Sequence, residues 1–139
     1  MNEAQETDIL LVEDNPNDAE LTQRALKKSD VGARLAVARD GAEALEYLLS
    51  NRPKPKVVFL DLKLPKIDGI EVLRRVRSDE RTRSLPVVVL TSSQEERDIS
   101  ECYKLGVNSY VVKPVEFDKF YKAVADLGIY WLVLNKSPL

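Results

Sequence analysis

Polar residues that can do chemistry stand directly after four apolar segments of this sequence. They are Glu13 with Asp14, Asp61, Thr91 with Ser92, and Lys113 with Pro114. Clustered carboxylates repel one another unless a cation joins them, and hard oxygen ligands of this kind are those that Mg²⁺ accepts. A carboxylate beside a bound cation and a fixed lysine can also attack a phosphoryl group, because both positive charges neutralise the transferring oxygens. If the fold gathers these residues, it creates a site for cation binding and phosphoryl transfer.

The apolar segments themselves have the composition of strands buried on both faces. They comprise residues 9–12, 57–60, 86–90 and 110–112, with a weaker candidate at 35–38. Segments with the spacing of helices alternate with them. Three of these follow Pro16, Gly41 and Gly69, a fourth spans 99–105 and ends at Gly106, and a fifth spans 117–135.

This alternation predicts the α/β class. Strand and helix succeed each other five times through short loops, so each connection is expected to be a right-handed crossover between parallel strands. The predicted fold is a doubly wound five-stranded parallel sheet of order 2-1-3-4-5, flavodoxin-like, with helices on both faces. Ligands of such sheets bind outside the carboxyl ends of the strands, which is where the polar residues fall.

Size and composition favour a single cytoplasmic domain. The 139 residues suit one domain over 1–139, with 1–6 as a flexible N-terminal tail. A net charge of -2 gives no attraction to nucleic acid or to an anionic membrane. The acidic start is unlike a signal peptide, and no apolar run approaches the length of a membrane span, so a cytoplasmic location is expected. The absence of His excludes Ser-His-Asp catalysis, most zinc sites and a phosphohistidine donor.

Taken together, these motifs resemble the receiver domain of two-component response regulators. The carriers are residues 9–15, 60–65 with Asp68 and Gly69, 90–92, and 106–114. Each motif alone is weak, but all of them in this order and at these intervals are specific. A narrower resemblance, carried by residues 13–22 and 130–135, is to single-domain regulators that serve phytochrome-type sensor histidine kinases.

The resemblance implies a function in a phosphorelay. Asp61 would accept a phosphoryl group from a sensor histidine kinase, in a reaction that needs Mg²⁺ held by Glu13, Asp14, Asp61 and the backbone carbonyl of Lys63. Lys113 would pair with the phosphoryl group, and the bond from Lys113 to Pro114 would be cis. The chain would thus be a phosphoacceptor, not an enzyme with an external substrate.

The resemblance also implies a switch. Thr91 would move toward the phosphoryl group, and Tyr110 would turn inward and reshape the surface of the fourth helix, fifth strand and fifth helix. Since no DNA-binding segment follows the fifth helix, output is expected through another protein or through self-association.

Two other functions share parts of this site. A haloacid-dehalogenase-type phosphatase needs a second Asp two residues after its nucleophile, and Lys63 stands there instead. A receiver-like docking module that works without phosphorylation remains open, and phosphate incorporation decides it. The carboxylates at 13 and 14 disfavour a flavodoxin phosphate site, and the sequence has no P-loop.

The fifth helix carries more apolar residues than one face needs. A stripe suited to cover the sheet consists of Phe117, Phe120, Val124, Leu127, Trp131 and Leu134. Further apolar residues lie outside this stripe, and those expected to form an interface are Ile129, Tyr130, Leu132 and Val133. A helix that is apolar all round must be covered on more than one side, so a two-fold homodimer is predicted.

Overall fold

A five-stranded parallel sheet forms the centre of the protein, as seen in a computed structural model that describes residues 6–29, 32–114 and 116–136. The strands are β1 (Ile9–Val12), β2 (Leu35–Ala38), β3 (Val57–Leu60), β4 (Val87–Thr91) and β5 (Ser109–Val112). Their order is β2-β1-β3-β4-β5, which confirms the predicted topology. Nearly all of the predicted N-terminal tail lies outside the described residues.

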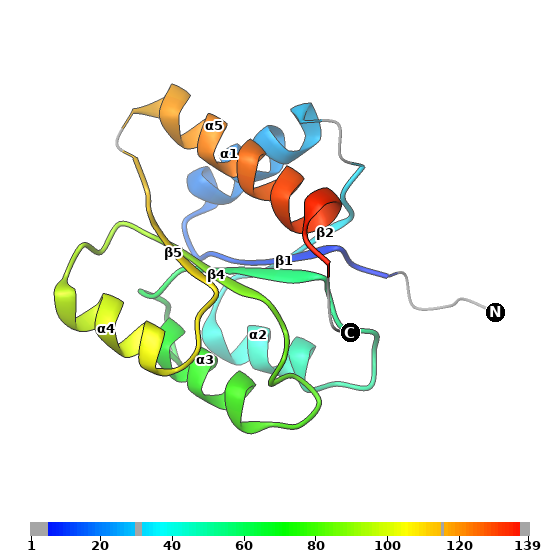
Figure 1. The fold of residues 1–139 in the computed structure, drawn as a ribbon, viewed down its shortest axis with the longest axis vertical. Helices are drawn as coiled ribbons and strands as arrows, with labels where there is room; N and C mark the ends of the chain where they lie inside the picture. The colour runs from blue at the N-terminus through cyan, green and yellow to red at the C-terminus, as the bar shows by residue number, and fades with distance from the viewer. Residues whose placement is uncertain (1–5, 30–31, 115, 137–139) are drawn as a thin grey trace.

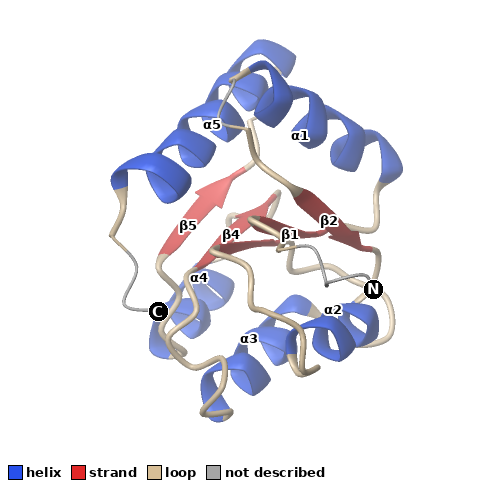
Figure 2. Ribbon diagram, turned by 90° about the vertical axis from the view of Figure 1, so that its right-hand side faces the viewer, coloured by secondary structure: helices blue, strands red, loops and turns tan. Residues whose placement is uncertain are grey.

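Helices cover both faces of this sheet (Figures 1 and 2). They are α1 (Pro16–Lys28), α2 (Gly41–Leu48), α3 (Gly69–Ser78), α4 (Glu96–Lys104) and α5 (Phe117–Ile129), which continues into the π-helical turn η1 (Tyr130–Leu134). In Figure 2, α1 and α5 lie above the sheet, and α2, α3 and α4 lie below it. Within the described part of the chain, no helix has the length and apolar character needed to cross a membrane.

Alternate residues of each strand feed two separate cores, because successive side chains of a strand point to opposite faces. In β1, Leu10 and Val12 join the core beneath α2 and α3, whereas Ile9 and Leu11 join the core beneath α1 and α5. All four are at most 2% exposed. A central strand buried on both sides explains why this segment is continuously apolar instead of alternating.

Side-chain caps fix where three helices begin. Asn15 accepts hydrogen bonds from the backbone N–H groups of Asn17 and Asp18 at the start of α1. Asp40 and Asp68 cap α2 and α3 in the same manner. These residues satisfy N–H groups that have no partner within the helix. As a result, only three residues separate the end of β1 from the start of α1, which stays close to the edge of the sheet.

The last turn of the chain departs from the helical pattern that the sequence predicts. Val124 is fully buried and Trp131 packs against the α1/α5 core, as expected from the stripe. Leu134 is 64% exposed, however, and Leu132 packs against that core instead. The π-helical turn from Tyr130 holds more residues per turn than an α-helix, so the inward-facing position moves by a residue or two.

Candidate functional site

Strand pairing brings the polar residues to one edge of the sheet. Val12 pairs with Leu60, so Glu13 and Asp61 leave β1 and β3 side by side. The N–H group of Asp61 still donates to the Val12 carbonyl, at 3.0 Å. Lys113 follows β5 at the same edge. The carboxyl ends of three strands therefore deliver two carboxylates and an ammonium group to one place, as the sequence predicts.

A cluster of three carboxylates lies there. One oxygen from each of Glu13, Asp14 and Asp61 lies within 4.8 Å of the other two. Glu13 and Asp61 are only 3% and 8% exposed, whereas Asp14 is open to solvent. Oxygen donors at this spacing, partly buried and partly reachable from water, fit a hard divalent cation. The donor set thus agrees with the cation site predicted from the sequence.

Lys113 supplies the positive charge of the site. Its Nζ lies 2.7 Å from Glu13 Oε1, 3.0 Å from Asp61 Oδ2 and 3.0 Å from Asp18 Oδ2. Burial by itself lowers the pKa of this ammonium, but the hydrogen bond to Glu13 and the charges of Asp61 and Glu13 outweigh burial and raise the pKa. Lys113 is therefore charged at every physiological pH, and it faces more negative charge than it can neutralise.

Glu13 is the group most perturbed by this crowding. Burial raises the pKa of its carboxyl to about 7, despite the hydrogen bond and charge of Lys113, which act in the opposite direction. The charge of Asp61 makes a smaller contribution to this raised pKa. The second oxygen of Glu13 accepts the Asn15 N–H at 3.2 Å. Without a cation, Glu13 therefore stays partly protonated near neutral pH.

A hydroxyl group and a tyrosine lie on the β4 and β5 side of the site. Thr91 is fully buried at the end of β4, and its Oγ1 accepts the Ser93 N–H at 3.4 Å. The hydroxyl of Tyr110 donates to the Ser93 carbonyl at 3.0 Å. Ser93 in turn donates its hydroxyl to Asp98 Oδ2 at 2.6 Å, which connects the loop to α4. The two predicted switch residues, Thr91 and Tyr110, thus meet at Ser93.

The loop after Asp61 is held close to the site by Gly69. A Cβ atom at position 69 would lie 2.2 Å from the Asp61 carbonyl oxygen, so only glycine permits this approach. The Gly69 N–H donates to the Leu62 carbonyl at 2.8 Å, and the Leu62 N–H donates to Asp61 Oδ1 at 2.7 Å. This network orients the Asp61 carboxylate.

One geometric expectation is wrong. Among the described residues no peptide bond is cis, so Lys113 is joined to Pro114 by a trans bond. Trans is the more stable isomer before proline by about 0.5 to 1 kcal/mol, and here Lys113 reaches all three of its carboxylate partners from it.

Two residues near the site were not among those predicted to act there. Asp18 binds Lys113, and Asp98 binds Ser93. Both stand in the first turn of a helix, where an acidic residue is expected for its interaction with the helix dipole. Because this local interaction is enough to explain an acidic residue there, the sequence gives no sign of the longer-range contact. Only the packing of α1 and α4 shows which neighbours these carboxylates have.

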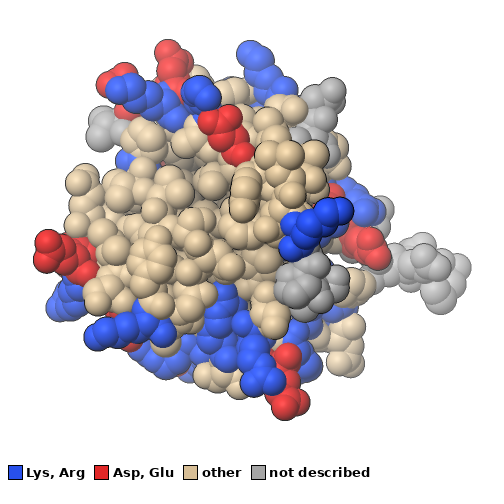
Figure 3. All heavy atoms as spheres, viewed as in Figure 1, with Lys and Arg blue, Asp and Glu red and all other residues tan. Residues whose placement is uncertain are grey.

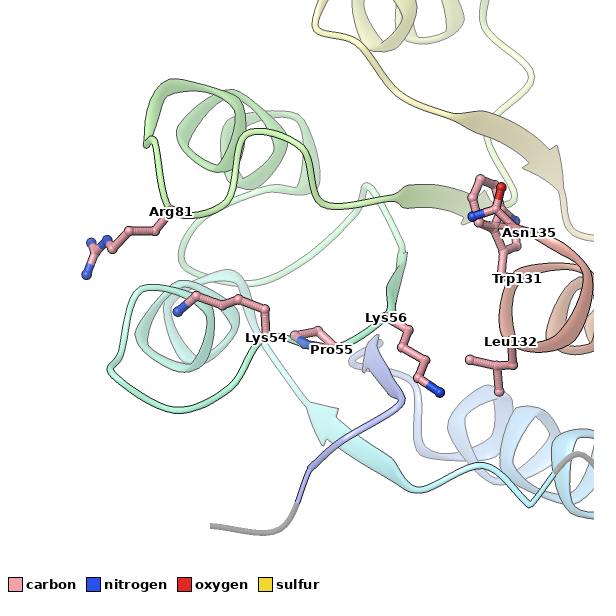
Figure 4. Close-up of a pocket in the computed structure, with 7 residues that line it drawn as sticks. All are labelled: Lys54, Pro55, Lys56, Arg81, Trp131, Leu132 and Asn135. Carbon is pink, nitrogen blue, oxygen red and sulfur yellow. The ribbon is translucent and has the colours of Figure 1, made fainter. Parts of the chain in front are cut away.

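Hollows lie at both edges of the sheet. One of about 450 Å³ beside the site is lined by Asp14, Lys63 and Asp68, among others, and gives a donor molecule room to approach. Another of about 490 Å³ lies at the opposite edge, between the loops before β3 and β4 and the turn η1 (Figure 4). Its lining includes Lys54 and Trp131, and two other lining residues, Lys56 and Arg81, form ion pairs with Asp8 and Asp79. Each of these two carboxylates therefore has its own cationic partner, unlike the cluster of three at the carboxyl edge.

The sequence is similar to that of known regulators over most of its length. The family described as response regulator receiver domain matches residues 9–125. The chain is 44% identical over 134 residues to the probable methanogenesis regulatory protein FilR2 of Methanothrix harundinacea, covering 94% of this chain and 86% of that one. It is 40% identical over 135 residues to response regulator Rcp1 of Synechocystis, covering 94% and 92%.

Solved structures similar to this protein are also those of response regulators. The Mn²⁺-bound form of Rcp1 and the phosphorylated cyanobacterial phytochrome response regulator RcpA both superpose with a TM-score of 0.90 at 38% identity, covering 96% and 97% of this chain and 99% and 100% of theirs. The bacteriophytochrome response regulator AtBRR is 54% identical, with a TM-score of 0.72, and covers 96% of this chain and 100% of its own. The resemblance to phytochrome response regulators is thereby confirmed.

Proposed function

Because this chain belongs to the response-regulator receiver domains of two-component systems, we propose that Asp61 is the residue that accepts the phosphoryl group. The observation that supports it best is the 3.0 Å ion pair between Asp61 Oδ2 and Lys113 Nζ beside the carboxylate cluster. Asp61 directly follows β3, the central strand, so it lies in the middle of the site. Phosphorylation of RcpA is consistent with this role.

Mg²⁺ is the proposed cofactor. Glu13, Asp14, Asp61 and the backbone carbonyl of Lys63 would hold it, and the spacing of the three carboxylates supports this set. A divalent cation neutralises charge on the transferring phosphoryl oxygens. The Mn²⁺-bound form of the similar regulator Rcp1 supports a divalent cation as the cofactor.

Asp61, Lys113 and Thr91 have distinct proposed roles in the transfer of the phosphoryl group. An oxygen of Asp61 forms a bond to phosphorus as the phosphorus–nitrogen bond of the donor phosphohistidine breaks, and the departing imidazole nitrogen takes up a proton. Lys113 places its ammonium against the phosphoryl oxygens, since its Nζ already lies within hydrogen-bond distance of Asp61. Thr91 donates its hydroxyl to another of these oxygens.

The signal would leave through the surface formed by α4, β5 and α5. Movement of Thr91 toward the phosphoryl group alters the loop that holds Ser93, to which Tyr110 is hydrogen-bonded. Tyr110 is partly buried against the core beneath α2 and α3, which also includes Cys102 of α4, so a change at Ser93 is transmitted to that surface.

We place a homodimer contact at the end of α5 on this same surface. Figure 3 shows a broad face with few charged side chains over α5 and β5, bordered by charged side chains at α4. Ile129, Tyr130 and Val133 are 37%, 48% and 62% exposed there. Leu132, included in the predicted interface, is only partly exposed because it packs against the α1/α5 core. Exposed apolar side chains gathered in this way favour a protein partner, and a second copy gives a closed two-fold assembly.

The phosphoryl donor is proposed to be a cytoplasmic sensor histidine kinase of the phytochrome type. The 54% identity to AtBRR and the likeness to RcpA support this choice. The chain acts in this scheme as a phosphoacceptor that assists only its own phosphorylation and dephosphorylation. It works in the cytoplasm with the kinase, and neither nucleic acid nor membrane is needed as a partner.

Phosphate incorporation tests the proposed role of Asp61. The protein is incubated with acetyl phosphate and Mg²⁺ and examined by intact mass, and one phosphoryl group is expected. Asp61→Asn should abolish the added mass. Asp8→Asn is the matched control, because Asp8 is also 8% exposed but lies at the opposite end of β1. Equal labelling of the Asp61 variant would refute the assignment, and an unlabelled wild type would favour the docking module.

A further inference from the structure

All three donor positions of the Lys113 ammonium are already used by carboxylates. Glu13, Asp61 and Asp18 accept its hydrogen bonds at 2.7, 3.0 and 3.0 Å. An ammonium group has three protons and accepts no bond, so it has no free position for a further oxygen. On phosphorylation a phosphoryl oxygen can take the place of the Asp61 carboxylate on Lys113, but a second phosphoryl oxygen can bind the ammonium only if Glu13 or Asp18 gives up its place.

The three carboxylates differ in how easily they can leave. The side chain of Glu13 is 4% exposed and that of Asp61 is 10% exposed, so neither can exchange Lys113 for water. The side chain of Asp18 is 33% exposed. Only Asp18 can turn outward and be solvated at once.

The position of Asp18 in the fold makes this exchange inexpensive. It stands in the first turn of α1, where the helix dipole stabilises a negative charge even without Lys113. Its backbone N–H is bound by Asn15, so the helix start stays fixed when the side chain moves. Asp18 and Lys113 also line a hollow of about 300 Å³ together with Pro114 and Phe117, which provides space for the movement.

We propose that Asp18 is a positioning residue that holds Lys113 before phosphorylation and competes with the phosphoryl group for its ammonium. The inference rests on the proposed phosphorylation of Asp61. In the unphosphorylated protein, Asp18 keeps Lys113 directed into the site. On phosphorylation, a phosphoryl oxygen replaces the Asp18 carboxylate, and Asp18 turns toward solvent. The contact between α1 and the segment that follows β5 thus depends on the state of Asp61.

The dissociation constant of beryllofluoride, measured by calorimetry at saturating Mg²⁺, tests this competition. Asp18→Asn keeps the shape of the side chain and removes its charge, so beryllofluoride should bind about fivefold more tightly. Asp18→Glu restores the charge and should return the constant to the wild-type value. The control is Glu20→Gln. Glu20 lies on the same helix but pairs with Arg24 instead of Lys113, so loss of its charge should change the dissociation constant less than twofold.

Ionic strength separates competition from a merely structural effect. The ratio of the Asp18→Asn and wild-type constants should shrink as salt is raised, because screening weakens the charge that competes. An Asp18→Asn protein that binds beryllofluoride no more tightly than wild type overturns the inference, and so does a ratio independent of salt. A wild type that does not bind beryllofluoride at all overturns the proposed phosphorylation instead.

Discussion

The carboxyl edge of the sheet and the far end of α5 depart from the usual distribution of residues in opposite directions. At the edge, Glu13 and Asp61 are charged groups kept at 3% and 8% exposure. At the end of α5, Val133 and Leu134 are apolar groups with 62% and 64% exposure. Charged residues are rarely buried without partners, and clusters of large apolar residues are rarely left in water without a function.

The difference shows what each region lacks. The acidic edge has an excess of negative charge and one ammonium group, so a small cation completes it. The end of α5 has exposed apolar side chains, and we propose that another protein surface covers them. The first deficit is electrostatic and depends on pH and metal, whereas the second is hydrophobic and depends on protein concentration.

The largest expected effect comes from removing the ammonium group. Lys113→Met should lower the free energy of unfolding by about 3 to 5 kcal/mol at pH 8 without metal, because it leaves buried carboxylates uncompensated. Denaturant unfolding measures the change. Lys122→Met is the control, since Lys122 pairs with Asp126 on the exposed surface of α5 and should cost less than about 1 kcal/mol. Equal costs for the two variants would mean that the edge carries no electrostatic strain.

The second prediction concerns pH. The Glu13 carboxyl has an ordinary pKa of 4.5 and a pKa of about 7 in the fold, because burial disfavours its charged form. The folded state therefore holds this proton where the unfolded chain has lost it, so stability falls as pH rises from about 4.5 to about 7. The contribution, fully present below this window and lost above it, amounts to about 3 kcal/mol in EDTA.

Glu13→Gln is the control for this pH dependence. It removes the titrating carboxyl while keeping a similar shape, so stability between pH 5 and 8 should become nearly flat. The measurement is the free energy of unfolding in EDTA at each pH. A wild-type protein whose stability rises across the same window would contradict the role assigned to Glu13.

The third prediction adds the cation to the acidic edge. Mg²⁺ should stabilise the folded state by about 2.7 kcal/mol when its concentration is a hundred times the dissociation constant. It should also flatten the pH dependence, because a divalent charge favours the ionised form of Glu13. Thermal unfolding with Mg²⁺ or EDTA measures both effects. Asp14→Ala should lose them, since it removes the most exposed carboxylate of the cluster.

The smallest effect on folding is expected at the end of α5. The double variant Ile129→Glu, Val133→Glu should change the stability of the monomer by less than about 0.5 kcal/mol, because both side chains are already exposed. It should nevertheless abolish the dimer in sedimentation equilibrium, with or without beryllofluoride. Gln23→Glu adds a negative charge at an exposed position of α1 on the side of β2 and should leave the dimer intact. A wild type that stays monomeric at tens of micromolar in both states would assign the surface to another partner.

Most of the acidic site could be predicted from the sequence because topology alone brings it together. Once parallel strands and right-handed crossovers are inferred, the residues after each strand must meet at one edge. Glu13, Asp61 and Lys113 meet although 100 residues separate the first from the last. No detail of side-chain packing is needed for that conclusion, and the predicted strand order is confirmed.

Residues on helices were harder to assign. Asp18 and Asp98 have an adequate local reason to stand in the first turn of a helix, so nothing in the pattern marks their contacts with Lys113 and Ser93. Those contacts depend on how α1 and α4 are rotated and placed against the sheet. The trans bond before Pro114 likewise could not be predicted from the sequence, because both isomers are possible before proline and the surrounding structure selects one.

The end of α5 shows the same division most clearly. The sequence by itself determined that this segment is helical and has more apolar residues than one face can bury, because composition and spacing are local properties. Only the tertiary structure decided which of these apolar residues are buried and which are exposed. A π-helical turn lets Trp131 and Leu132 pack against the core and leaves Leu134 outside. A π-helical turn forms where the free energy gained by packing apolar side chains exceeds the cost of irregular backbone hydrogen bonds. The packing partners lie far away in the sequence, so the sequence of the segment alone does not determine the turn.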